Sequence, residues 1–150
     1  MTTTIKGNLV MNKDMVYEGG LIVKGDIFGK DGIRHNLTVY GNITSGDIFA
    51  KDIIAVDINS GNIDAEDMDV NNITARDIDA INIDARNINA GDINAKNIKA
   101  EDIDVMNINA ENVIYYAVCF AYNNIKCKSI KGKKANSKHF VLDGKIEIIK

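Results

Sequence analysis

A large apolar residue recurs at every fifth position from Ile43 to Val113, and this period limits what the chain can fold into. It holds for 14 complete repeats over residues 43–112. A small or β-branched residue, mostly Ala, stands two positions after each large residue, and Asp or Asn always stands directly before it. The repeating unit is therefore Asp/Asn-Ile-x-Ala-x.

This period excludes both an amphipathic helix and a flat strand. An α-helix turns about 100° per residue, so steps of five residues would spread the large side chains around its surface. A flat strand has a period of two, which would put successive large residues on opposite faces. A coil that turns a corner once per repeat keeps every Ile and Ala inside and places Asp and Asn at tight turns, which suit them. The sequence predicts an all-β fold, a β-solenoid with coils about 4.8 Å apart.

The segment 1–42 has a longer period. Large residues six apart predict coils with longer sides, and the stretch "KDGIRH" predicts an irregular corner. These large residues are Leu9, Met15, Leu21, Ile27 and Ile33. We therefore divide the chain into N-terminal coils (1–42), the five-residue repeat region (43–117) and a C-terminal cap (118–150).

The C-terminal segment interrupts the repeat with "VIYYAVCFAY". Val118 keeps the five-residue spacing, and Ile125 and Ile130 resume it after a slip of two residues. The last residues, "KHFVLDGKIEIIK", predict two short strands joined as a hairpin at Asp143-Gly144. The segment is expected to cap the open coil end. A homodimer contact through its aromatic residues is the alternative, and both can hold together; these residues are Tyr115, Tyr116, Phe120 and Tyr122.

The repeat region resembles the pentapeptide-repeat proteins, in which Asp or Asn also precedes the large residue. The resemblance implies a quadrilateral β-helix with four repeats per coil. Here Ala lies two positions after the large residue, as in "ARDIDA", whereas in that family the small residue lies two before it. The phrases "KGNLVM" and "GGLIVKGDIFG" resemble hexapeptide and bactofilin-type solenoids, and the tail resembles small phage-borne proteins of unassigned function.

Charge is segregated along the chain. Residues 43–112 carry 5 basic and 15 acidic residues, a net charge of −10, whereas residues 113–150 carry 8 basic and 2 acidic residues, a net charge of +6. Like charges stacked at strand spacing repel, so an acidic column is either a solvated face or a docking surface for a basic partner. A three-sided coil would stack residues 15 apart instead of 20, and no such column would form. With four repeats per coil the predicted column is Asp64, Asp84 and Asp104, with Asp102 on the adjacent column.

No motif indicates catalysis, a cofactor or a metal site. No Gly-rich phosphate loop is present, and two Cys without a clustered His do not make a zinc site. We expect Cys119 and Cys127 to be reduced and buried. We also expect His35 and His139 to be structural, although hexapeptide acyltransferases, which place a catalytic His between subunits, leave His35 as an alternative.

Three functions fit these features. The first is a non-enzymatic phage or mobile-element protein whose acidic face occupies the basic nucleic-acid-binding surface of a host protein, as a DNA-mimic or anti-CRISPR inhibitor would. The second is a structural, virion or filament-forming solenoid. The third, with less support, is a protein that sequesters a small signalling nucleotide at a dimer interface. In each case we expect a cytoplasmic protein without a membrane segment, and an acidic rod that does not bind nucleic acid directly.

Overall fold

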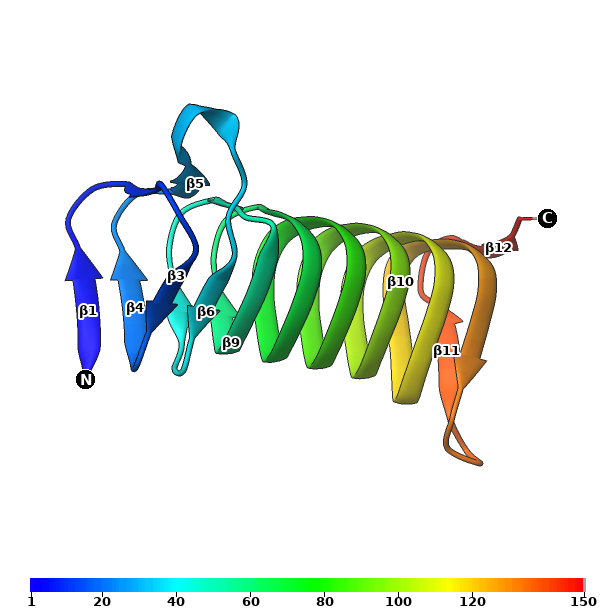
Figure 1. Cartoon of the computed structure of the whole chain (residues 1–150). Coiled ribbons are helices and arrows are strands. Elements are labelled where there is room, and N and C mark those ends of the chain that lie inside the picture. The colour runs from blue at the N-terminus through cyan, green and yellow to red at the C-terminus, as the bar shows by residue number, and fades with distance from the viewer. Residues whose placement is uncertain (150) are drawn as a thin grey trace.

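The computed structural model describes residues 1–149, apart from the side chains of 70–72, 75–77, 79–82, 84–87, 89–92, 95, 96 and 101. The chain winds into a β-solenoid whose termini lie at opposite ends of a rod (Figure 1). The predicted all-β solenoid is therefore confirmed. Its strands are β1 (Thr2–Ile5), β2 (Leu9–Met11), β3 (Met15–Tyr17), β4 (Gly20–Val23), β5 (Ile27–Gly29), β6 (Leu37–Val39), β7 (Ile43–Thr44), β8 (Ile48–Phe49), β9 (Asp52–Asn59), β10 (Ile63–Gly132), β11 (Lys138–Val141) and β12 (Lys145–Ile148).

One coil has three sides, and the four-sided coil implied by the pentapeptide-repeat resemblance is wrong. Ile63 lies beside Ile48 in the neighbouring coil, and Ile73 lies beside Ile58. The side chains of Asn94 and Asn109, further along the rod, keep the same separation of 15 residues. The size of the inward residues offers a physical reason. Ile reaches less far into the lumen than the Leu or Phe of pentapeptide repeats, so a narrower triangle is needed for close packing.

The three sides stack into three parallel sheets, which we call faces 1, 2 and 3. Face 1 contains β3, β6 and the start of β9. Face 2 contains β1, β4, β7, the end of β9, and β11 at the far end. Face 3 contains β2, β5, β8 and finally β12. The long element β10 winds through all three faces.

The N-terminal coils are wider than the central ones. Leu9 pairs with Ile27, and the Asn8 side chain bonds to the Asp26 backbone, so this coil takes 18 residues, or three sides of six. The next coil is lengthened by an excursion that begins with the 3-10 turn η1 (Lys30–Gly32), seen above the rod in Figure 1. This turn is the irregular corner expected at "KDGIRH". Ile33 was expected to continue the inward series, but the excursion carries it out of the core, and its side chain is exposed.

The core is a stack of the large residues of each repeat. Each large repeat residue from Ile43 to Val113 is buried, and Ala50, Ala65, Ala100 and Ala110 are buried with them. β-branched Ile suits this position because its restricted side chain packs well on a pleated surface. Stacking of identical side chains repeats the same contact at every coil, so stability builds along the rod from neighbour to neighbour.

The Asp or Asn before a large residue holds the corner together on face 3. There its side-chain oxygen accepts a hydrogen bond from the backbone N–H at the same corner of the next coil. Along face 3, Asn8 Oδ1 accepts from Asp26 N at 3.0 Å, Asp26 Oδ1 from Asp47 N at 2.9 Å, and Asp47 Oδ1 from Asn62 N at 2.7 Å. A corner N–H that is not paired within a strand needs such a partner. At these corners the Asp or Asn therefore has a structural role.

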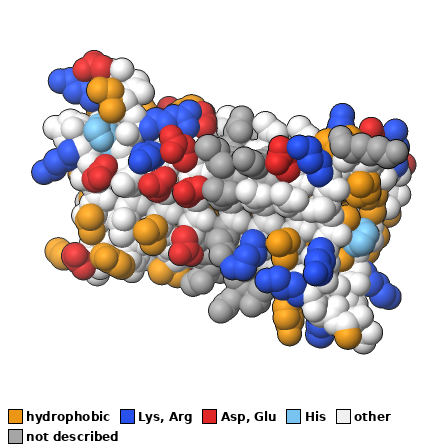
Figure 2. Space-filling model, turned by 45° about the vertical axis from the view of Figure 1, so that its right-hand side comes forward, with side chains coloured by type: hydrophobic (Ala, Val, Ile, Leu, Met, Phe, Trp, Pro, Cys, Tyr) orange, Lys and Arg blue, Asp and Glu red, His pale blue; other side chains and the backbone are white. Residues whose placement is uncertain are grey.

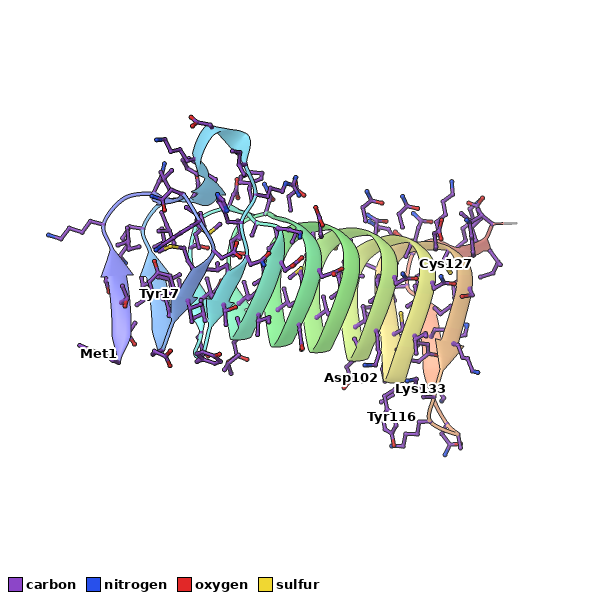
Figure 3. The ribbon with its side chains drawn as sticks, in the orientation of Figure 1. Met1, Tyr17, Asp102, Tyr116, Cys127 and Lys133 are labelled. Carbon is purple, nitrogen blue, oxygen red and sulfur yellow. The ribbon has the colours of Figure 1, made fainter. Side chains whose placement is uncertain are left out.

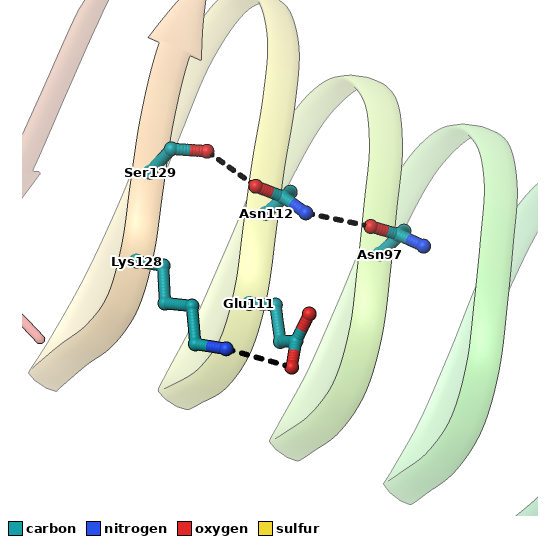
Figure 4. A network of polar contacts seen from close by, with 5 residues as sticks. All are labelled: Asn97, Glu111, Asn112, Lys128 and Ser129. Atoms are coloured by element: carbon teal, nitrogen blue, oxygen red, sulfur yellow. Dashed lines mark hydrogen bonds and ion pairs between the residues drawn. The ribbon is translucent and has the colours of Figure 1, made fainter. Parts of the chain in front are cut away.

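On face 1 the same position forms a ladder between side chains. Asn112 Nδ2 donates to Asn97 Oδ1 at 2.9 Å, and Ser129 Oγ donates to Asn112 Oδ1 at 2.6 Å (Figure 4). Lys128 Nζ lies 2.9 Å from Glu111 Oε1 beside this ladder. Ser129 and Lys128 are each 17 residues from their partners, whereas Asn112 is 15 residues from Asn97, so the coil has lengthened at the aromatic segment.

The slip of two residues occurs in two steps, and Val118 does not keep the inward position. Val118 N bonds to Asp102 Oδ1, 16 residues earlier, and the Val118 side chain is 38% exposed. Cys119 takes the inward place and is fully buried. A second added residue before Ile125 completes the slip. The five-residue count fails here because a corner one residue longer reverses which side chains point inward.

The predicted C-terminal hairpin is also wrong. β11 and β12 both form, but each pairs in parallel with β10 on a different face. Asp143-Gly144 turns the corner between the two faces instead of joining two antiparallel strands. A Cβ on Gly144 would lie only 1.7 Å from the carbonyl oxygen of Asn123, so the close approach of two coils requires glycine there.

Candidate interaction surfaces

The predicted acidic column does not form. Because a coil of the repeat region takes 15 residues, Asp64 lies on face 3 and Asp104 on face 2. Asp64 forms a two-pronged ion pair with Arg34, with N–O distances of 2.7 and 2.5 Å. The side chain of Asp84 lies outside the described residues. The four acidic residues chosen from a four-sided coil thus do not share one surface.

Asp102 has a structural partner. Its Oδ1 accepts the Val118 N–H at 3.0 Å, the corner bond described above. Asp104 lies two residues further on the same face, with an exposed side chain. Acidic residues do gather on face 1, where Asp67 stacks on Asp52 and Asp69 follows on the same strand. Sequence reasoning missed this group because it depends on the number of sides per coil.

Tyr115 is a core residue, and of its two predicted roles, cap contact and dimer contact, its burial fits the cap contact. Its side chain is 1% exposed, and its hydroxyl lies 2.7 Å from His139 Nδ1 in the next coil. Gly132 makes room for the ring, since a Cβ there would lie 2.9 Å from Tyr115 Cζ and 1.8 Å from Ser137 Oγ. Burial raises the pKa of the Tyr115 hydroxyl above its ordinary value. His139 thus has a structural partner, as expected.

The other predicted aromatic residues do lie at the surface, together with two that the sequence pattern did not single out. Tyr116 and Tyr122 are exposed, and Phe120 is partly exposed. The Phe120 ring meets the Tyr122 ring edge-on at 5.2 Å and the Phe140 ring at 5.0 Å. Phe140 and Leu142 were missed because the tail was expected to fold as a hairpin, whereas β11 stacks directly on residues 118–121.

Lysines lie at the same end of the rod as these rings. Figure 2 shows Lys and Arg side chains gathered around hydrophobic ones at the end of the rod that carries the C-terminal strands. Lys138 pairs in register with Val118 on face 2. Tyr116 and Lys133 project on the same side of the rod, next to Asp102 (Figure 3). The backbone N–H of Lys134 bonds to the carbonyl oxygen of Tyr116, which ties the loop after β10 to the aromatic segment.

The N-terminal end of the rod presents unpaired strand edges. Among the described residues, β1, β2 and β3 each pair on one side only, with β4, β5 and β6. Thr3 pairs with Leu21, whose side chain is buried, so the Thr3 side chain faces the lumen of the solenoid. It is nevertheless exposed. Met15 and Tyr17 are only partly buried for the same reason. This end therefore exposes both backbone hydrogen-bonding groups and apolar core.

His35 and the two cysteines are the remaining candidate groups. His35 Nδ1 lies 3.8 Å from Asp14 Oδ1, which also accepts the Asn36 N–H at 2.9 Å. Cys119 and Cys127 are buried free thiols, and burial raises the pKa of Cys119 to about 12. A thiol with such a pKa stays protonated and unreactive near neutral pH. In the part of the chain that the structure describes, no three His, Cys, Asp or Glu residues are grouped to hold a metal ion.

Comparison with family models, curated proteins and solved structures gave no match. The chain is therefore defined by its architecture, a three-sided parallel β-solenoid. Among the described residues, no helix is long and apolar enough to cross a membrane.

Proposed function

We propose that the protein is a non-enzymatic structural solenoid that associates with a second copy through its N-terminal end. The observation that carries this proposal is the set of three unpaired strand edges, β1, β2 and β3, around a partly exposed core. Such an edge is a template for pairing with another chain. A second copy would pair the free backbone groups and cover the apolar core in one contact.

The composition of β1 supports pairing at this end. Its residues, Thr2 to Ile5, are β-branched and uncharged, which favours a strand and leaves no charge to repel an approaching edge. At the other end, β11 carries Lys138, and β12 carries Lys145 and Glu147. Charged residues are a common means of protecting strand edges. The sequence favoured a homodimer through the C-terminal segment, whereas the charge of the edges favours the N-terminal end.

A two-fold axis through face 2 gives the simplest such dimer. Rotation about an axis normal to that face reverses the strand direction, so β1 would pair antiparallel with its own copy. The same rotation exchanges faces 1 and 3, so β2 would meet β3 of the second copy. The contact is self-complementary and closed, as in most homodimers, and leaves both C-terminal ends free.

A matched pair of variants tests this assembly. Thr4 and Thr44 lie in one column of face 2, two coils apart, with exposed side chains. Of the two, Thr4 alone stands on a strand that pairs on one side only among the described residues. In the dimer of a Thr4→Lys variant the two introduced ammonium groups would face each other, so association is expected to weaken by about a hundredfold or more. Thr44→Lys should leave association unchanged.

Thr4→Pro gives a second test through the backbone. The carbonyl oxygens of Met1 and Ile5 bond to the β4 side, so by strand alternation the N–H of Thr4 faces away from β4. Proline would remove this donor while leaving the pairing with β4 intact. Light scattering with size exclusion over a wide concentration series should show a dimer for the wild type and a 16.4 kDa monomer for both Thr4 variants. A wild type that is monomeric throughout, or a Thr4→Lys dimer as tight as wild type, contradicts the proposal.

A second candidate function rests on the acidic group of face 1. Asp52, Asp67 and Asp69 could dock a basic surface of a partner, as the sequence predicted for an acidic face, and a phage or mobile-element origin would suit an inhibitor of this kind. The Asp/Asn-Ile repeat is what supports a relation to pentapeptide-repeat and phage-borne proteins. Inhibition of a nucleic-acid-handling enzyme that survives replacement of all three Asp by Asn would count against this candidate.

A further inference from the structure

We infer that the C-terminal end of the rod carries a binding surface for single-stranded nucleic acid. The surface consists of outward side chains from two adjacent strands of face 2, and we call it the aromatic–lysine surface. Its members are Val118, Phe120, Tyr122, Lys138, Phe140 and Leu142. It is separate from the N-terminal end and does not depend on the dimer proposed above.

Large parts of the aromatic side chains of this surface are exposed to solvent. Tyr122 and Phe140 are each 46% exposed, and both rings lean on Phe120, with centroid distances of 5.2 and 5.0 Å. The side chains of Val118, Phe120 and Tyr122 alternate outward along one strand, while Cys119 and Ala121 between them fill the core. Contiguous exposed apolar side chains of this kind mark interaction sites.

The charge around the rings selects the partner. Residues 113–150 hold eight Lys and only two acidic residues, Asp143 and Glu147. Glu147 lies 3.7 Å from Lys145 on face 3, away from the rings, whereas Asp143 lies at the edge of the surface, where its backbone N–H bonds to the carbonyl oxygen of Tyr122. Lys138 stands beside the rings on face 2. An anionic partner is therefore favoured over a neutral or basic one.

Rings and lysines together favour single-stranded nucleic acid over other anions. Exposed aromatic rings stack on unpaired bases, and lysines follow the phosphate backbone. A duplex hides its bases and offers nothing to the rings. The acidic region of a second copy would satisfy the lysines but not the rings. Asp102 and Asp104 lie on the preceding coil of the same face, so a phosphate chain would be repelled from the rod and confined to the last two coils.

Fluorescence anisotropy with labelled oligothymidylate and oligouridylate tests the inference. Binding should weaken as salt increases, because lysine–phosphate contacts release counterions. Tyr122→Ala and Phe140→Ala should each weaken binding by about tenfold, since each removes a stacking ring. Tyr40→Ala is the matched control, because Tyr40 is 62% exposed but lies in the N-terminal coils. It should bind as the wild type does.

Two lysine variants measure how much charge contributes to oligonucleotide binding. Lys138→Gln should lower the slope of log affinity against log salt by about 0.7, the value for one phosphate contact on a single strand. Lys24→Gln, in the N-terminal coils, should leave the slope unchanged. Thermal unfolding followed by circular dichroism checks that the variants remain folded.

Three results would overturn the inference. One is the absence of oligonucleotide binding at low salt. Another is unchanged affinity of both ring variants, or equal affinity for single and double strands, because attraction by charge alone needs no rings. The third is salt-sensitive association between copies, or binding to anionic lipid vesicles, without any oligonucleotide binding.

Discussion

The two ends of the rod close the same core in opposite ways. Each end places a tyrosine at the small-residue position of face 1, Tyr17 at the N-terminal end and Tyr115 near the C-terminal end. Tyr115 is enclosed by one further coil, in which the Lys133 N–H bonds to the Tyr115 carbonyl oxygen and His139 meets the Tyr115 hydroxyl. Tyr17 has no coil beyond it among the described residues and stays partly exposed. A large ring fills the lumen at both ends, but among the described residues only the C-terminal ring is covered by a further coil.

The strand edges at the two ends also differ in charge and in side-chain type. The C-terminal edge is charged and lies beside aromatic residues, whereas β1 at the N-terminal edge is uncharged and β-branched. A solenoid must cover or protect both of its ends. This comparison suggests that the C-terminal end is protected within the chain and that the N-terminal end is protected by association.

Replacing each tyrosine by alanine should give the largest difference in stability between the two ends. Tyr115→Ala would empty a fully buried site and remove the partner of His139, so we expect a loss of about 3–5 kcal/mol in the free energy of unfolding. Tyr17→Ala removes a ring that is already partly in water, and about 1–2 kcal/mol is expected. Urea denaturation of the two variants measures the difference. Equal losses would mean that the two ends are enclosed to the same extent.

Two glycines at corners provide a smaller and sharper test. Gly144→Ala would force the last corner away from the Asn123 carbonyl, with an expected loss of about 1–3 kcal/mol. A Cβ on Gly7, at a corner of the first coil, would meet no atom within 4 Å, so Gly7→Ala should change stability by less than about 0.5 kcal/mol. Urea denaturation of both variants provides the check. If Gly7→Ala is the more harmful change, the N-terminal corner is packed against a second chain or is otherwise constrained.

The sequence predicted the fold class because one rule, repeated many times, leaves few alternatives. Ile at every fifth position excludes helix and flat strand, and Asp or Asn before it fits a corner. The number of sides per coil was not accessible in the same way. A five-residue side is compatible with triangles and squares, and only the packing of Ile and Ala in the lumen distinguishes them. That single unknown decided which acidic residues stack, so the predicted column was wrong although its charges were counted correctly.

The ends were harder to predict because they are not repetitive. Tyr116 and Tyr122 lie at the surface, whereas Tyr115, two positions after Val113, stands at the inward small-residue position and is buried. A ring fits at this position because the missing side chain of Gly132, in the next coil, leaves space for it. Val118 was misplaced because one extra residue at a corner shifts the inward series to Cys119. Which side chain points inward at these positions depends on contacts with the neighbouring coil, and a local sequence pattern does not describe those contacts.

A shift to alkaline pH should test the two tyrosines through the smallest expected change in stability. Burial raises the pKa of both Tyr17 and Tyr115 above 10.0, and a hydrogen bond with Ser137 partly offsets this at Tyr115. Below pH 10 both phenols are protonated in the folded and unfolded chain, so they add no pH dependence. As pH rises above 10, the unfolded chain releases these protons first, and stability falls until the folded pKa values are reached. Urea midpoints on either side of pH 10 should therefore fall less steeply for Tyr115→Phe, and likewise for Tyr17→Phe, than for the wild type, because each variant removes one buried phenol. The same slope for the wild type and Tyr115→Phe would show that the C-terminal end opens to water before the chain unfolds, and would remove the contrast between the two ends.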